Sequence, residues 1–377
     1  MGIDNLDGQT VLIVGAGIAG TALATALGRL GVHSEVIDVD DRTVGAHIGL
    51  TNRAVDVLSE IGVLDEVVEA GSAQQDNVFI RMYTEDGQAI PVPPPPRPDT
   101  DLPASIGIYR PTLSEILVRA ASAAGATVRR GISVSSFSQD DTGVDVTFTD
   151  GSTGRYPLVV GADGVRSRVR ELVHPDLTPH YTGVAALRWM LDEEPPGPVG
   201  FYNTRTEMVA VAPVKGGLTY VATGAESPEG HRVDAGEARD LLRSVLARFP
   251  APVTSALLAK LTDDQNVLVH PYEWIMVPPP WHRGRIALIG DAAHATTAHM
   301  SSGGGLALED AAVLAQELVA ADSVEVALDQ FTARRFERVK LVVDASVKLL
   351  EMHQAGASQM EMGMLRTKAT AALIQPY

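Results

Sequence analysis

The 377-residue sequence contains no cysteine. It therefore has no disulfide bond, no thiolate nucleophile and no cysteine-based metal site, which agrees with a reducing compartment, and we expect a cytoplasmic protein. Basic residues are also scarce, because 30 lysines and arginines stand against 47 aspartates and glutamates, giving a net charge of −17. Nucleic acids and anionic membranes repel such a chain, so we expect neither as a partner.

Long hydrophobic runs are missing as well. The best candidate for a membrane span, residues 11–27, is interrupted by three glycines, is followed by Arg29, and is short for a bilayer. The opening MGIDNLDGQT lacks the basic segment of a signal peptide. The histidines are scattered and neither HExxH nor GxSxG occurs, so we expect no metal site and no serine hydrolase. Demanding chemistry would then have to come from an organic cofactor.

The N-terminal part is typical of a strand, turn, helix and strand. TVLIV is an apolar strand, GAGIAG is the turn, ALATALGRL is helical, and SEVID is the next strand. In such a turn Gly15 allows the tight bend, Gly17 lets the backbone approach a pyrophosphate, and Gly20 lets the helix pack on the strand. Asp38 ends the second strand, where a carboxylate binds an adenosine ribose. This pattern predicts a dinucleotide site but does not separate NAD from FAD.

The rest of the chain alternates between helix-rich and strand-rich parts. Short alternating runs such as EMVAVAPV and GLTYVATG predict an antiparallel sheet, interrupted by one helix near residues 235–248. We expect an α/β fold: a Rossmann-like domain with an inserted antiparallel β-sheet domain and C-terminal helices. The predicted cofactor-binding domain comprises residues 1–70, 101–178 and 279–377, and the predicted substrate-binding sheet domain comprises residues 71–100 and 179–278.

Two later strand-to-turn segments complete the pattern. They are LVVGADGVRSRVR at residues 158–170 and GDAAHATTAHMSSGGGLALEDA at residues 290–311. Together with GAGIAG, in this order and at this spacing, they resemble the single-component flavoprotein aromatic hydroxylases, the para-hydroxybenzoate and salicylate hydroxylase group. The resemblance runs from about Val11 to Ser346. It implies FAD, held at its ADP half by the first turn and at its other half by the late Gly-Asp loop.

The resemblance also implies individual cofactor contacts. Asp291 would bind the ribityl and pyrophosphate region, and the backbone at residues 303–305 would approach the isoalloxazine ring. A helix that begins there directs its positive end toward the ring. The expected cofactor contacts are Gly15, Gly17, Ile18, Ala19, Gly20, Asp38, Arg42, His47, Ile48, Arg110, Asp163, Gly290, Asp291, Gly303, Gly304 and Gly305.

Several of the charged positions keep a second interpretation. Arg42 reaches a phosphate or lies in solvent, and Arg110 reaches the FAD phosphates or ribose or is a solvated residue at a helix start. Asp163 resembles the aspartate of the family's middle motif, which contacts FAD and supports NAD(P)H use. Arg166 and Arg170 beside it either join that site or form surface salt bridges.

The chain departs from the family pattern at two places near the expected flavin. His47 stands where the family has a glycine, and Asn52 where it has a proline. His47 packs against FAD or, alternatively, makes a polar or covalent link to it. Ala298 replaces a proline just before His299, beside the reactive face of the ring. Oxygen activation or ring position is therefore expected to differ from the family.

By the same resemblance, NADH or NADPH reduces FAD, and reduced FAD reacts with molecular oxygen. The resulting flavin C4a-hydroperoxide hydroxylates a small aromatic or heteroaromatic substrate. His299 and Ala298 are the expected catalytic positions, with His299 as the best-placed proton acceptor. Ordinary packing is the alternative for each of the expected substrate contacts, which are Arg188, Tyr202, Met208, Tyr220, His270 and Tyr272. We expect a monomer or a homodimer.

Other functions remain compatible with this sequence. A flavin-dependent dehydrogenase or reductase, or a halogenase, would share the fold, although EWIMVPPP does not match the WxWxIP pattern of halogenases. A non-catalytic FAD-bound protein is a further alternative from another class. NAD(P)H consumption in the presence of oxygen would separate the monooxygenase from these alternatives.

Overall fold

A six-stranded sheet supports the N-terminal glycine-rich turn. The computed structural model describes residues 6, 8–40, 45, 47–74, 81–92 and 96–377. The strand order is β18-β19-β12-β1-β2-β8, and all pairs are parallel except β18 with β19. The bounds are β1 Thr10–Val14, β2 His33–Asp38, β8 Thr127–Arg130, β12 Val159–Gly161, β18 His282–Arg283 and β19 Ile286–Leu288. The predicted strand-helix-strand start of the chain is confirmed.

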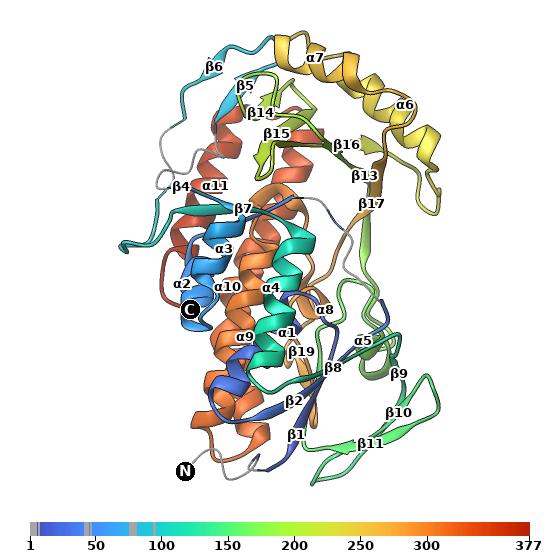
Figure 1. Ribbon diagram of the computed structural model, residues 1–377, viewed down its shortest axis with the longest axis vertical. Helices are drawn as coiled ribbons and strands as arrows, with labels where there is room; N and C mark the ends of the chain where they lie inside the picture. The colour runs from blue at the N-terminus through green and yellow to red at the C-terminus, as the bar shows by residue number, and fades with distance from the viewer. Residues whose placement is uncertain (1–5, 7, 41–44, 46, 75–80, 93–95) are drawn as a thin grey trace.

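Helices form a thick layer beside this sheet (Figure 1). Helix α1 is almost wholly buried, because alanine, threonine and leucine side chains let it pack against both α4 and α9. Helix α10 runs from the level of this sheet to the other end of the molecule, where α11 turns back along it. The bounds are α1 Ile18–Arg29, α2 Arg53–Glu60, α3 Leu64–Ala70, α4 Arg110–Ala123, α5 Arg168–Val173, α8 Asp291–His294, α9 Gly303–Ala320, α10 Val324–Gln354 and α11 Gln359–Leu373.

A seven-stranded sheet occupies the opposite end of the molecule (Figure 1). Its order is β17-β13-β16-β15-β14-β5-β6, antiparallel except for the pair β14 and β5. The bounds are β5 Met82–Thr84, β6 Ala89–Ile90, β13 His180–Leu191, β14 Gly200–Asn203, β15 Met208–Val214, β16 Leu218–Glu226 and β17 Val267–Trp274. The predicted fold class, α/β with an antiparallel sheet, is confirmed.

Two helices, α6 and α7, cover one face of this sheet. We expected one helix, but the chain forms α6 at Ala235–Leu246 and α7 at Pro252–Lys260. Proline fits the first position of a helix, so Pro252 starts α7 rather than breaking a helix. Leu242, Leu246 and Leu257 pack here against the buried side chains of the sheet. The other face is left to line a cavity.

Two three-stranded sheets complete the fold. The sheet β3-β7-β4 comprises His47–Thr51, Ser105–Tyr109 and Ser72–Gln74, and the sheet β11-β10-β9 comprises Thr153–Tyr156, Val144–Phe148 and Val134–Gln139. Strand β4, from the predicted substrate domain, pairs with β7, from the predicted cofactor domain. The division into two domains stays a prediction. No helix in the described part of the chain has the length and apolar character needed to cross a membrane.

Candidate active site

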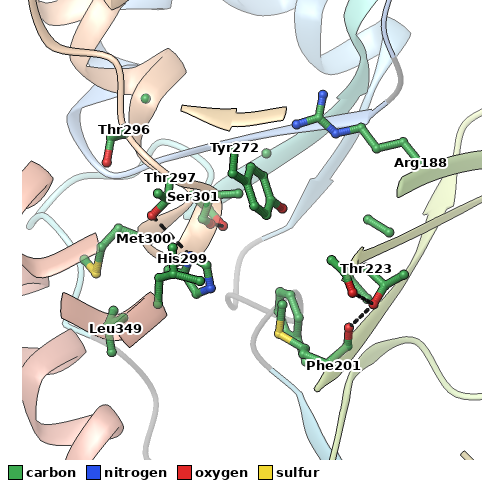
Figure 2. Close-up of a pocket in the computed structure, with 18 of the residues that line it drawn as sticks. Arg188, Phe201, Thr223, Tyr272, Thr296, Thr297, His299, Met300, Ser301 and Leu349 are labelled. Carbon is green, nitrogen blue, oxygen red and sulfur yellow. Dashed lines mark hydrogen bonds between the residues drawn. The ribbon is translucent and has the colours of Figure 1, made fainter. Parts of the chain in front are cut away.

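A cavity of about 950 Å³ lies where the seven-stranded sheet, the glycine-rich turn after β1, the loop before α9 and the C-terminal helices meet. Its volume is that of a site for a cofactor or a small organic ligand. Figure 2 shows His299 and Leu349 on one side of it and Arg188 and Phe201 on the other. Residues more than 100 positions apart in the sequence therefore share one space.

The turn between β1 and α1 uses its three glycines in different ways. Gly15 has φ +113°, and a β-carbon there would overlap the carbonyl of Ala162. A β-carbon on Gly20 would overlap the carbonyl of Gly15. At Gly17 a β-carbon would meet no atom within 4 Å, and Gly17 lines the cavity with Ile18 and Ala19. The fold thus needs Gly15 and Gly20, whereas Gly17 leaves open the space that a pyrophosphate requires.

The expected ADP contacts have distinct positions around this turn. Asp38 accepts a hydrogen bond from the backbone of Ala16 at 2.6 Å, so its carboxylate is held beside the glycine turn. Arg110 opens α4 and lines the cavity. Arg42 lies outside the described residues. An FAD molecule fits this arrangement: Gly17 would accommodate the phosphates, and Asp38 has a carboxylate where a ribose would bind.

An aspartate of α9 holds the loop that precedes this helix. Asp310 is fully buried and accepts hydrogen bonds from the backbone of Gly290 at 2.9 Å and from His294 Nε2 at 2.5 Å. Arg335 of α10 donates to the other oxygen at 2.8 Å. These positive partners keep the pKa of Asp310 below its usual value even though burial opposes the shift. The network fixes the turn from which Asp291 faces the cavity.

The three glycines at the start of α9 also divide by role. Gly303 and Gly304 line the cavity, and Gly305 does not. A β-carbon on Gly304 would lie 2.7 Å from Ile48 Cδ1, and one on Gly305 would lie 3.3 Å from Ala54 Cβ. Close packing of α9 on β3 and α2 therefore explains these two glycines, and Ile48 joins the cavity wall through the same contact.

The middle motif supports the late loop. Asp163 accepts hydrogen bonds from Ser167 Oγ at 2.5 Å and from the backbone of Arg168 at 2.7 Å, which ties it to the start of α5, and it does not line the cavity. Arg170 is buried and donates to the carbonyl of Ala292 at 2.8 Å. Arg166 forms a surface ion pair with Glu273. Of the two interpretations for these arginines, the surface salt bridge describes Arg166. Arg170 instead connects α5 to α8 through the carbonyl of Ala292.

His47 lies deep in the cavity wall. Its ring stacks on Tyr220, with centroids 5.3 Å apart. Burial lowers the pKa of His47 to about 4, so the imidazole is neutral at neutral pH. Burial likewise raises the pKa of Tyr220 to about 12. The two stacked rings are neutral, which agrees with packing against a flavin more than with a charged contact.

Four of the six expected substrate contacts line the cavity, namely Arg188, Met208, Tyr220 and Tyr272. Tyr202 does not, because successive side chains of a strand face opposite sides of the sheet. It stacks on Tyr83 in the core under α6 and α7 and donates to the carbonyl of Pro198. Its neighbour Phe201 points into the cavity instead.

His270 is also outside the set of cavity-lining residues. It lies on β17 outside the cavity, while Pro271 and Tyr272, which follow it, reach the cavity. Burial of its ring, with smaller effects from Arg188, Arg110 and Arg166, lowers the pKa of His270. We therefore remove Tyr202 and His270 from the candidate substrate site.

The two expected catalytic positions lie in a short 3-10 helix, Ala298–Met300, that faces the cavity. The ring of His299 is 6.2 Å from that of Tyr272 and 6.4 Å from that of His353. Burial lowers the pKa of His299 to about 4, with smaller contributions in the same direction from His353 and Arg366. His299 is a neutral imidazole at neutral pH, which is the form that accepts a proton.

The C-terminal helices form a wall of the cavity that no sequence pattern indicated. Leu349, His353, Met362 and Arg366 line the cavity from α10 and α11. No motif marks them, and only the return of α11 along α10 brings them to the site. Within the described ranges, no cluster of three histidine, aspartate or glutamate side chains is arranged to hold a metal ion.

Comparison with known proteins gives the same picture. Residues 9–346 match the FAD binding domain family. The aurachin C monooxygenase/isomerase of Stigmatella aurantiaca is 30% identical over 354 residues, covering 92% of this chain and 90% of that protein. An FAD-dependent urate hydroxylase of Mycolicibacterium vanbaalenii is 28% identical over 346 residues, covering 87% of this chain and 84% of that protein.

A solved structure extends the likeness to three dimensions. The structure of Klebsiella pneumoniae HpxO complexed with FAD and uric acid is 25% identical to this chain, with a TM-score of 0.78. The likeness covers 98% of this chain and 95% of HpxO. The glycine turns, the anchored Gly-Asp loop and these matches agree. The chain belongs to the FAD-dependent aromatic hydroxylases, a family of flavoprotein monooxygenases.

Proposed function

We propose that this enzyme uses NAD(P)H and molecular oxygen to hydroxylate a small aromatic or heteroaromatic substrate. The observation that carries the proposal is that the residues suited to FAD and the residues suited to a substrate line the same cavity. Gly17, Ile48 and Asp291 form the part suited to FAD, and Arg188 and Tyr272 belong to the sheet that faces it. A ring held against that sheet would lie within reach of the cofactor.

Each wall has its own task in this proposal. The turn at Gly17 and the carboxylate of Asp38 would hold the ADP half of FAD, and Asp291 would hold the ribityl region. Bound FAD would supply the electron transfer and the activation of oxygen. The aromatic and apolar side chains of the sheet, such as Phe201 and Tyr272, would orient the substrate ring and exclude water.

His299 is the proposed proton acceptor for the substrate. It is neutral at neutral pH, it faces the cavity, and it neighbours Tyr272 on the substrate side. Its Nδ1 lies 3.2 Å from Thr297 Oγ1. Thr297 is itself held by Ser346 of α10 at 2.9 Å, so the histidine has a fixed support. Removal of a phenolic or ring N–H proton makes the ring more electron-rich, which favours attack on an electrophilic oxygen.

The related proteins support this substrate class. One is named a urate hydroxylase, another a 2-heptyl-3-hydroxy-4(1H)-quinolone synthase of Pseudomonas aeruginosa, and both names refer to nitrogen-containing ring compounds. We propose a substrate of comparable chemistry for this enzyme, a phenol, an aminobenzoate or a hydroxypyridine.

A nicotinamide would bind only transiently in this proposal. The single GxGxxG of the sequence is assigned to FAD. Arg110, Arg166 and Arg188 all contribute to the lowered pKa of His270, and Arg166 is ion-paired with Glu273. The charges of Arg110 and Arg188 would favour the approach of an anionic dinucleotide. We expect an aromatic substrate to accelerate flavin reduction by about tenfold or more, which corresponds to about 1.4 kcal/mol of barrier.

The experiment is a screen of the FAD-loaded protein for NAD(P)H oxidation stimulated by phenols, aminobenzoates and hydroxypyridines. Stimulated oxidation that yields a hydroxylated product supports the proposal. Oxidation at the same rate with and without every ring compound, in air, indicates a reductase or dehydrogenase. A halogenated product in the presence of halide indicates a halogenase. Bound FAD without any NAD(P)H oxidation indicates a non-catalytic flavoprotein.

A further inference from the structure

One face of α11 forms part of the cavity wall. Met362, Arg366 and Thr370 recur every four residues, so they lie on the same side of this 15-residue helix, and all three line the cavity. Met362 and Thr370 are buried. The helix is firmly started by Ser358 and Glu361, which form a reciprocal capping box. Arg366 is therefore presented to the cavity from a defined element.

The guanidinium of Arg366 has no protein partner in the part of the chain that the structure describes. Three arginines of α10 differ from it, because Arg334, Arg335 and Arg338 each pair with a carboxylate of α9. Glu207, which lines the same cavity, is already ion-paired with Arg248. Burial lowers the pKa of Arg366. Since arginine stays charged in proteins, this positive charge calls for an anion.

The surroundings of Arg366 contain two imidazoles, and the acid whose charge acts on His353, Glu207, is already paired with Arg248. His299 and His353 both lie close enough for Arg366 to lower their pKa values. His353 Nε2 is buried and has no hydrogen-bond partner within the described ranges. The ring of His353 also bonds to the backbone of Glu207, and a neutral imidazole has only one N–H to donate. Arg366 is therefore the donor of this wall that a carboxylate oxygen would satisfy.

From this geometry we infer that the substrate carries a carboxylate, and that Arg366 binds it at the wall formed by α10 and α11. The inference rests on the proposed function, because it narrows the substrate to aromatic or heteroaromatic acids. The ring would then extend from α11 toward Tyr272 and the sheet, passing His299. Arginine suits this role because its planar fork pairs with both carboxylate oxygens.

The test uses benzoate and its neutral counterpart benzamide as probes of the FAD-loaded enzyme. Binding is measured by calorimetry and by the change in the absorption of the bound flavin. We expect Arg366→Gln to weaken benzoate binding by about tenfold or more and to leave benzamide binding unchanged. Arg366→Lys should restore part of the loss. FAD content and the thermal midpoint of each variant show that the fold is intact.

Two control variants separate this subsite from general electrostatics. Lys368→Gln removes an exposed positive charge from the same helix and should leave benzoate binding unchanged. Arg188→Gln removes the arginine of the facing sheet. The inference is overturned if millimolar benzoate does not bind the wild-type enzyme, if Arg366→Gln binds it as tightly as wild type, or if only Arg188→Gln weakens it. Because benzoate binding needs no turnover, the result is independent of whether the enzyme proves to be a hydroxylase.

Discussion

Asp310 Oδ2 accepts a hydrogen bond from the backbone nitrogen of Gly290 at 2.9 Å, which joins helix α9 to the turn that presents Asp291. The same carboxylate receives His294 and Arg335. These side chains are all buried, and Arg335 also pairs with the buried Glu309, so the charges are balanced inside the protein rather than by solvent. The position of the late Gly-Asp loop therefore depends on a buried ion-pair network as well as on the glycines.

We expect Asp310→Asn to destabilise the protein by about 3–5 kcal/mol, because the buried Arg335 loses a charged partner. The turn at Gly290 should loosen, so FAD binding should weaken as well. Urea unfolding and FAD titration measure the two effects. Asp329→Asn is the matched control, since Asp329 pairs with His282 at the surface and should contribute about 1 kcal/mol or less. Equal stability losses in both variants would contradict a special role for the network.

Gly17→Val should abolish FAD binding while the fold stays intact. Gly17 has φ −77°, which any residue tolerates, and its β-carbon would meet no protein atom within 4 Å. The valine would therefore occupy the space proposed for the pyrophosphate. The yellow colour of the purified protein and its circular dichroism report the outcome. Gly363→Ala, an equally open helical position, should retain FAD. Normal FAD affinity in Gly17→Val would refute the assigned cofactor position.

Ala298→Pro should fold normally and change the coupling of NAD(P)H consumption to product formation. Thr297 already has the extended backbone, φ −69° and ψ 161°, that a residue before proline adopts, and Ala298 is the first residue of its short helix. A proline would stiffen the loop beside the flavin. The measurement is the ratio of hydroxylated product to hydrogen peroxide. An unchanged ratio with an unchanged reduction rate would show that the alanine has no special effect here.

The protein should lose stability between about pH 6.5 and pH 4, partly through His47. Burial lowers the pKa of His47 in the folded state to about 4 from its ordinary value of 6.5. The unfolded chain therefore binds a proton in this range before the folded protein does, and the free energy of unfolding falls as the pH falls. The full effect is about 3 kcal/mol for one histidine.

The check is urea unfolding of wild type and His47→Gln at about pH 7 and about pH 5, with FAD in constant excess. The variant should lose less stability than wild type on acidification. His33→Gln replaces an exposed histidine and should behave as wild type does. Parallel pH profiles of wild type and His47→Gln would mean that His47 does not titrate in this way.

The sequence predicted the parts of the site that depend on local backbone chemistry. The turn at Gly15 and Gly17 and the α/β fold with its antiparallel sheet follow from short patterns whose geometry is fixed by neighbours in the chain. Tyr202 was assigned to the cavity, although a shift of one residue along β14 moves a side chain to the other face. No local pattern tells which face of that strand the cavity occupies.

Contacts between segments far apart in the chain could not be predicted from the sequence. Arg170 was considered a cofactor or surface residue, but it bridges the middle motif to Ala292 across the interior. No sequence motif marks Asp310 or Arg335, which lie within helices, yet they hold the late Gly-Asp loop in place. Arg366 reaches the cavity only because α11 folds back along α10. Such roles emerge from tertiary packing, for which a single sequence carries no direct signal.

The central claim is that this protein inserts an oxygen atom from molecular oxygen into an aromatic ring. The most direct measurement supplies the FAD-loaded enzyme with NAD(P)H, isotopically labelled oxygen gas and the ring compound that best stimulates NAD(P)H oxidation, followed by mass spectrometry of the product. We expect a hydroxylated ring that carries one labelled oxygen atom. Recovery of an unmodified ring with all the label in hydrogen peroxide, or of a hydroxyl derived from water, would contradict it.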